Sequence, residues 1–345
     1  MIKGSKLRWP VLALAALSIA PLHGARANDY FAGKTISIVH TGGVAGTFAV
    51  YSRLVAAHMP KHIPGKPAMI LQFMPGGGGI TGANYLYNAA PKDGTWLLMP
   101  TPGLELTPFL YKDSVKYDLA KMNWLGNMTQ AQSFVSVWHN TPVVKWEDAR
   151  QHELLMGATG RGSQEFISLH QMNAVLGTKF KIITGYKGIS DVDQAMERGE
   201  VQGRSGGWTG GRGKHLFVPP SRVRIILQIG AKRISEPFPG GPDISNVPLL
   251  TELASNDADR QLLSLQSRVL SRAIVGPPQM PPAHVKILSE AFDRMMLDPE
   301  FQAEAQKLNL EFINPMNAAE TTAYIKWITD LPDAIKDRYR KLVSD

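Results

Sequence analysis

The stretch TISIVHTGGVAGTFAVYSRLVAAH, residues 35–58, decides the fold of this chain. Its first six residues are rich in β-branched side chains and predict a buried strand. A glycine-rich turn follows at 41–47. The apolar residues of the next run then recur at the spacing of one helical face: Phe48, Tyr51, Leu54 and Val55. The stretch therefore predicts a strand, a glycine loop and a helix in direct succession.

The same pattern returns at residues 68–89, where AMILQFM (68–74) leads into a turn at 75–79 and a helix from 80. The first N–H groups of a helix lack intrahelical partners, and glycine lets a ligand approach the backbone, so each turn can hold an anion. Two such turns side by side indicate one cleft that holds one small anion; the alternative is that the glycines only end the strands. With Thr101, which follows a third strand at 95–99, the candidate ligand residues are Thr41, Gly42, Gly43, Gly46, Thr47, Phe48, Pro75, Gly76, Gly77, Gly78 and Gly79.

Strand-like and helix-like runs keep alternating along the chain, which is typical of α/β proteins. A strand at 154–158 precedes a third glycine turn at 160–163, and a helix is expected at 165–176. Candidate residues of this turn are Arg161, Gly162 and Ser163. Ser163 stands where a serine caps a helix, and the same position would let its hydroxyl bind a ligand oxygen.

Two arginines and one tryptophan lie in glycine-rich loops. Arg161 and Arg204 can each clamp a carboxylate with two hydrogen bonds, or can instead face solvent or pair with an acid of the protein. Trp208 lies between two pairs of glycines and is either a lid over a cleft or a residue packed between domains.

The first 27 residues have the pattern of an export signal. A basic start (Lys3, Lys6, Arg8) precedes the apolar run at 11–20, and ARA at 25–27 is a cleavage site of the A-x-A type. Cleavage after Ala27 would leave 318 of the 345 residues, enough for two domains. It would also remove four cations and lower the net charge from +8 to +4. The chain has no cysteine, which excludes disulfides, thiolate metal sites and a lipid-anchored N-terminus, so we expect a free periplasmic protein.

Several chemistries find no support in the sequence. Gly77, Gly79 and Gly82 fit G-x-G-x-x-G, but the acid expected about 20 residues later could only be Glu105, in a proline-rich turn. The chain has no P-loop motif, no G-x-S-x-G elbow and no basic-aromatic run of a nucleic-acid-binding protein. His58 and His62 are four residues apart, yet Pro60 should break the helix that would align them. We therefore expect no enzyme, cofactor, metal or nucleic-acid partner.

These motifs, in this order, resemble the exported solute receptors of tripartite tricarboxylate transporters, the Bug type of periplasmic binding protein. The resemblance covers nearly the whole mature chain. It rests on Lys34-Thr35-Ile36 with its glycine loop, and on the segments 74–79 (MPGGGG), 90–95 (APKDGT), 160–163 (GRGS), 185–188 (GYKG) and 247–250 (VPLL).

The resemblance implies a fold and a function. The fold would be a two-lobed α/β clamshell of the second periplasmic-binding-protein type, each lobe a mixed, mostly parallel sheet flanked by helices. Lobe 1 would comprise 28–132 plus 270–345, and lobe 2 would comprise 133–269. A small carboxylate would lie between the glycine loops of lobe 1 and the loops of lobe 2, where Tyr186, Arg204 and Trp208 join the third glycine turn. The partners would be this organic acid and the membrane permease subunits, and the receptor would be a monomer.

Three positions depart from the family pattern. Receptors of this type often have aspartate, asparagine and histidine where this chain has Ala49, Phe73 and Phe166. Because each change replaces a polar group by an apolar one, we expect a carboxylate with an apolar or aromatic body, against Phe48 and Trp208. An exported hydrolase that uses the same cleft, or a ligand sensor for a signalling partner, stays open as an alternative.

Overall fold

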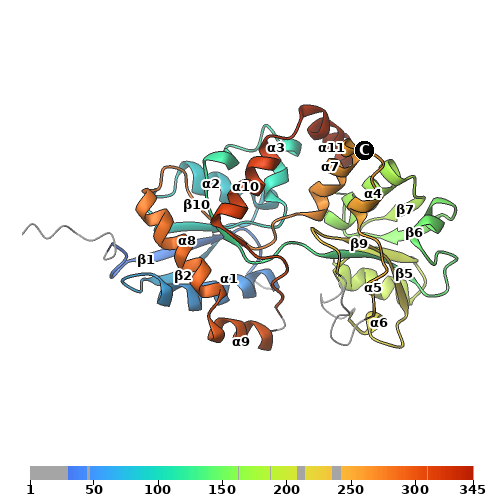
Figure 1. Cartoon of the computed structure of the whole chain (residues 1–345), viewed down its shortest axis with the longest axis horizontal. Coiled ribbons are helices and arrows are strands. Elements are labelled where there is room, and N and C mark those ends of the chain that lie inside the picture. Colours follow the sequence, from blue (N-terminus) through green and yellow to red (C-terminus); the bar gives the residue numbers. More distant parts are fainter. Residues whose placement is uncertain are drawn as a thin grey trace, which may run out of the picture.

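The computed structural model describes residues 30–44, 47–161, 163–186, 188–207, 214–234, 242–308 and 310–344, which form two lobes (Figure 1). Each lobe is built on one mixed sheet with helices packed on it. The α/β fold class expected from the sequence is therefore confirmed. The expected export signal, and the candidate residues Gly46, Gly162 and Trp208, lie outside the described residues.

The first lobe has six strands in the order β11-β4-β10-β3-β1-β2. β1 runs parallel to β2 and β3, β10 is antiparallel to β3 and β4, and β11 is antiparallel to β4. The strands are β1 (Thr35–His40), β2 (Ala68–Phe73), β3 (Trp96–Met99), β4 (Asn123–Asn127), β10 (Ala273–Gly276) and β11 (Met316–Asn317). The helices are α1 (Thr47–His58), α2 (Ile80–Asn88), α3 (Thr107–Leu110), α8 (Pro282–Met296), α9 (Pro299–Lys307) and α10 (Ala318–Thr329), with the 3₁₀ turns η2 (Met59–His62), η3 (Gly77–Gly79), η4 (Leu104–Leu106) and η5 (Leu119–Lys121).

The second lobe has five strands in the order β7-β6-β8-β5-β9. β6 is parallel to β7 and β8, and β5 is antiparallel to β8 and β9. The strands are β5 (Ser133–Trp138), β6 (Leu154–Gly157), β7 (Phe180–Ile183), β8 (Gly203–Gly206) and β9 (Val223–Ile229). The helices are α4 (Gln164–Leu176), α5 (Ile189–Glu197), α6 (Lys214–Phe217) and α7 (Asp257–Ser267), with the 3₁₀ turns η6 (Trp146–Arg150) and η8 (Leu250–Leu253).

Two extended segments, 128–132 and 268–272, connect the sheets, and we call them the crossing segments. They run antiparallel and bind each other: Met128 N donates to Arg272 O, Ser271 N to Thr129 O, and Ala131 N to Val269 O, each at 3.0 Å. The lobes are thus joined by a two-stranded ribbon and not by two segments that run independently.

A buried acid holds one crossing segment. The Glu105 carboxylate, 2% exposed, accepts a hydrogen bond from Leu270 N at 2.8 Å, and the Tyr324 hydroxyl lies 3.5 Å from it. Burial raises the pKa of this carboxyl to about 7, against the effect of its hydrogen bonds. Glu105 is therefore enclosed by the protein. It has no support as the acid that binds the ribose of a dinucleotide after a G-x-G-x-x-G loop.

The last helix, α11 (Asp333–Ser344), contacts both lobes. It packs on α3 of the first lobe and on α4 and α7 of the second, and Figure 1 shows it beside α7. Tyr339 is buried; its hydroxyl accepts from Gln266 Nε2 at 2.7 Å, and its ring meets the Phe109 ring edge-on. One apolar cluster continues from the first lobe into Phe166 and Ile167 of α4, so the lobes share packing on this side.

Candidate functional site

The second glycine loop, residues 75–79, exists because four successive glycines adopt positive φ. The φ angles of Gly76 to Gly79 are 138°, 55°, 64° and 98°, a region that L side chains rarely enter. Pro75, Gly76, Gly77 and Gly78 are exposed. A side chain would find open space at Gly78, whereas at Gly79 its Cβ would lie 2.2 Å from Thr101 Oγ1. The loop therefore presents bare backbone to solvent directly before α2.

Two threonines tie this loop to the neighbouring strand ends. Thr41 Oγ1 accepts a hydrogen bond from Thr101 N at 2.7 Å and lies 3.2 Å from Thr101 Oγ1. Thr101 Oγ1 donates to Gly78 O at 2.7 Å. Because that bond uses the only hydroxyl hydrogen of Thr101, the Thr41 hydroxyl donates to Thr101 in turn. The structure thus brings together Thr41, Thr101, Gly78 and Gly79, four of the residues predicted from the sequence.

The described part of the first glycine loop, residues 41–44, lies next to the rings of His40 and Phe48. A Cβ at Gly42 would lie 2.7 Å from Phe48 Cδ1 and 2.9 Å from His40 Nε2, so glycine is required there. Gly43 is exposed, and a Cβ added to it would meet no atom within 4 Å. Thr47 begins α1, and Phe48 lies half-buried with its ring 4.1 Å from that of His40. The backbone of Gly42 thus lies close to the ring of Phe48, which belongs to α1.

His40 lies under this loop, and the sequence reasoning did not single it out. The side chain is fully buried, its Nδ1 lies 2.7 Å from Ser52 Oγ, and Ser52 Oγ donates to Met99 Sδ at 2.8 Å. With the serine hydrogen used, Nδ1 is assigned as the donor to Ser52. Burial lowers the pKa of His40, so the imidazole is neutral at pH 7.

In the second lobe the third glycine turn leads into α4. Ser163 Oγ accepts from Phe166 N at 3.3 Å, which is the cap expected from the sequence. Thr159 donates to Glu165 with its N–H and its hydroxyl, and this closes the turn. Ser163 is half-buried and the Arg161 side chain is exposed. The cap is thus observed, and contact of Ser163 with a ligand stays a prediction.

Arg204 has a structural role. Its side chain is 1% exposed, and Nε donates to Asp193 Oδ1 at 2.5 Å while Nη1 donates to Gly207 O at 3.2 Å. Its guanidinium also stacks over the Phe217 ring. We therefore correct the expectation that Arg204 binds the ligand. The structure shows the alternative that the sequence also allowed, in which the arginine pairs with an acid of the protein.

Tyr186, the other candidate of this lobe, is half-buried near β6. Its Cε2 would lie 3.5 Å from a Cβ at Gly157, and it packs against the apolar cluster that includes Val192 and Met196 of α5. Burial raises the pKa of its hydroxyl.

One cavity of about 160 Å³ connects the two lobes near the second glycine loop. Gly78, Thr107 and Val269 line it from one side, and Gln164 and Ile167 of α4 from the other. The exposed backbone of the loop and the first turn of α4 therefore face each other. A larger cavity of about 670 Å³ lies elsewhere, around Arg268 and Trp327, and none of the described residues of the two glycine loops lines it.

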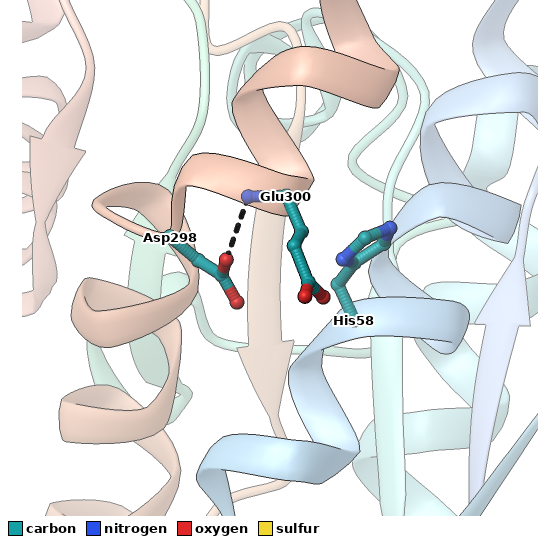
Figure 2. A group of neighbouring side chains, drawn as sticks. All are labelled: His58, Asp298 and Glu300. Atoms are coloured by element: carbon teal, nitrogen blue, oxygen red, sulfur yellow. Dashed lines mark hydrogen bonds between the residues drawn. The ribbon is translucent and has the colours of Figure 1, made fainter.

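One group of histidine and acid side chains in the described residues has metal-like spacing, namely His58, Asp298 and Glu300 (Figure 2). The Lys61 ammonium lies 2.6 Å from Asp298 Oδ2 and 2.8 Å from Glu300 Oε2, and it lowers the pKa of Asp298. A cation thus already bridges the two carboxylates, and we assign no metal.

His58 of this group and the nearby His62 each lie within hydrogen-bond distance of a carboxylate of α9 or its N-terminal cap. α1 ends at His58, two residues before Pro60, and Pro60 lies in the turn η2, so the helix is broken there as expected. Nε2 of His58 lies 2.7 Å from Glu304, and Nε2 of His62 lies 2.9 Å from Asp298. The group is therefore a network that attaches α9 to α1.

The similarity of this chain to known proteins lies in its structure. No family model matches the chain, and no curated protein matches its sequence. Among solved structures, a ligand-free TctC solute-binding protein from Polaromonas matches with a TM-score of 0.69 and 16% identity, over 90% of this chain and 98% of the other. A Rhodopseudomonas palustris protein with adipate matches with a TM-score of 0.61 and 19% identity, over 90% and 97%.

MatC from Rhodopseudomonas palustris, with bound malate, matches with a TM-score of 0.60 and 18% identity, over 90% of this chain and 99% of the other. Similarity at this level of identity establishes the fold. The chain therefore has the two-lobed fold of the TctC-type periplasmic solute-binding proteins, and the resemblance indicated by the sequence is confirmed at the level of the fold.

Proposed function

We propose that this protein is a periplasmic receptor that captures a small organic carboxylate between its lobes. The observation that carries the proposal is the joined pair of glycine loops. They end adjacent parallel strands, Thr41 and Thr101 tie them together, and the exposed backbone at Gly78 faces α4 across a cavity. Backbone N–H groups before a helix favour an anion, and closure of two lobes around it lets one ligand contact both.

We further propose that the carboxylate has an apolar or aromatic body. Phe48 and Phe73 are half-buried next to His40. Their ring centroids lie 4.1 and 5.2 Å from the centroid of the His40 ring. Their edges offer apolar surface next to the first glycine loop. Ala49 and Phe166 are buried, so of the three departures from the family pattern Phe73 is the one that supports this preference.

Export and partners complete the proposal. Residues 1–27 would direct the chain to the periplasm and be removed after Ala27, and the mature monomer would deliver its ligand to membrane permease subunits of a tripartite tricarboxylate transporter. None of the helices in the described ranges combines the length and apolar character needed to span a bilayer. Fractionation of cells and N-terminal sequencing would test this, with Asn28 expected as the first residue.

The test of ligand binding is a thermal-shift screen of the mature protein, followed by calorimetry. The panel contains benzoate, 3-phenylpropionate, adipate, malate, citrate and aspartate. We expect the aromatic acids to bind more tightly than citrate and aspartate. The reverse order would contradict the apolar-body proposal, and no shift with any carboxylate would contradict the receptor itself. Recovery of the bound acid unchanged separates a receptor from a hydrolase.

A further inference from the structure

Arg272 lies at the end of the second crossing segment, and no acidic side chain of the described residues pairs with its charge. Its N–H donates to Asn127 Oδ1 and its carbonyl accepts from Met128 N, so it stands where the ribbon joins the first sheet. Within the described residues no carboxylate pairs with Arg272 or affects its pKa, which burial lowers to about 10. A partly desolvated cation is thus held between the lobes without neutralisation.

Two aromatic rings of α1 fix the guanidinium in place. Its Cζ lies 5.0 Å from the centre of the Phe48 ring and 4.7 Å from that of Tyr51. The Tyr51 hydroxyl is itself fixed, since it donates to Glu311 O at 2.8 Å and accepts from Glu311 N at 2.9 Å. Phe48 also forms the floor of the first glycine loop, so Arg272 lies next to that loop.

The hydrogen bonds of the guanidinium are incomplete on one side. Nη1 donates to Ser271 O at 2.6 Å and lies 2.8 Å from Ser271 Oγ. Nε is enclosed and has no partner. Nη2 makes no hydrogen bond to the described residues, yet it is not among the enclosed atoms. An arginine held in one orientation with one open donor, Nη2, is suited to a charge-assisted hydrogen bond to a carboxylate.

Arg204 shows how this fold treats an arginine that serves the structure. That side chain is also buried and also stacks on a ring, but Asp193 lies 2.5 Å from its Nε. Arg272 likewise lies over aromatic rings, but no acid in the part of the chain that the structure describes is paired with it. Leaving a partly buried cation unpaired lowers stability, which is a common property of binding sites.

We propose that Arg272 is the charged anchor of the ligand carboxylate, a role that rests on the proposed receptor function. It places the carboxylate beside Phe48, at the floor of the cleft and against the ribbon between the lobes. An ammonium group next to the carboxylate would bring a second cation to the same place. The ligand class is therefore a carboxylate without a neighbouring amine, and its neutral carboxamide does not bind.

The experiment uses the mature protein and the panel acid that gives the largest thermal shift, together with its carboxamide. We expect Arg272→Met to bind that acid about tenfold to hundredfold more weakly, the range of a charge-assisted hydrogen bond. We expect Arg272→Lys, which keeps the charge and is the milder change for folding, to bind about tenfold more weakly and still prefer the acid to the amide.

Arg268→Met is the matched control. Arg268 lies four residues earlier on the same crossing segment and also stacks on rings, those of Tyr324 and Trp327, but it lines the other cavity. We expect its affinity to be that of the wild type. Wild-type affinity in Arg272→Met or Arg272→Lys would overturn the anchor and leave the receptor standing. Failure of every carboxylate to shift the wild type would overturn both.

The ligand-free stability gives a second, independent result. If Arg272 served only to pack between Phe48 and Tyr51, its replacement by methionine would lower the melting temperature and spare ligand affinity. We expect the opposite pattern, an unchanged or raised melting temperature with weaker binding, because an apolar side chain of similar length removes an unpaired charge.

Discussion

The hydroxyl oxygen of Thr41 lies 2.7 Å from the backbone nitrogen of Thr101, and it accepts the hydrogen of that N–H. The two residues follow β1 and β3, which are neighbours in the first sheet. Since Thr101 also donates to Gly78 O, a single chain of hydrogen bonds sets the position of the second glycine loop relative to the first.

We predict that Thr101→Val loosens this loop. Valine keeps the shape and loses the bond to Gly78, so the free energy of unfolding should fall by about 1 kcal/mol and ligand affinity about fivefold. Denaturant unfolding and calorimetry measure the two effects. Thr322→Val removes an exposed hydroxyl bond on α10 and should spare affinity. Equal affinity in both variants would contradict the role of the tether.

Gly78→Ala tests the backbone approach. Its φ of 64° strains any L side chain, while the space around its Cβ is open. Gly199, at the end of α5, has a φ of 77° and equally open space, so Gly199→Ala is a matched control. Each variant should lose about 1 kcal/mol of stability. Only Gly78→Ala should also weaken ligand binding, and equal binding by the two would argue against the loop as part of the site.

Ser163→Ala separates the two roles of this residue. Loss of the cap on α4 should lower stability by about 1 kcal/mol. If the hydroxyl also reaches the ligand, affinity falls about tenfold as well. Asn317→Ala removes the cap of α10 and provides a control that changes stability alone. A stability loss with wild-type affinity in Ser163→Ala would leave the cap as its single role.

The buried carboxyl of Glu105 predicts a pH dependence of stability. Its pKa is about 7 in the folded protein, against an ordinary value of 4.5, so the folded state holds this proton more tightly than the unfolded chain does. The proton of Glu105 thus contributes to the free energy of unfolding. This contribution is complete below pH 4.5 and is lost as pH rises towards 7, by an amount on the order of 3 kcal/mol.

Glu105→Gln keeps the shape and the acceptor for Leu270 N, so it should flatten the stability profile between pH 4.5 and 7 and stabilise the protein at pH 8. Unfolding curves across this range measure the difference from the wild type. Glu153→Gln, at an exposed position, should leave the profile unchanged. A parallel profile for the wild type and Glu105→Gln would refute the assignment.

The parts of the fold that could be predicted are those with a local cause. The strand at 35–40, the glycine turns and the cap at Ser163 follow from residues that are close in sequence, and α4 begins one residue before the expected helix at 165–176 and ends with it. β4 and β10 were not predicted, because each is short and pairs with a strand about 150 residues away. α11 was not predicted either, since its polar sequence forms a helix that is stabilised by packing on both lobes.

The residues of the candidate site also differ in whether the local sequence could predict them. Backbone-defined positions such as Gly78 and Gly79 could be predicted because their φ angles demand glycine. Arg204 was assigned wrongly, since Asp193 precedes it by 11 residues and only the folded chain shows their contact. His40 and Arg272 were overlooked. His40 ends an apolar strand directly before a glycine loop, which is a usable signal, whereas the missing acid beside Arg272 depends on everything packed around it.

The C-terminal helix gives the molecule a fixed edge. Because α11 packs on α3, α4 and α7, parting of the lobes at this edge would disturb the packing of Tyr339 and uncover a shared core. We therefore expect any opening of the lobes to be greatest at the opposite edge of the molecule, where α1 and α5 lie in Figure 1. A ligand bound between the lobes would then enter and leave at that opposite edge.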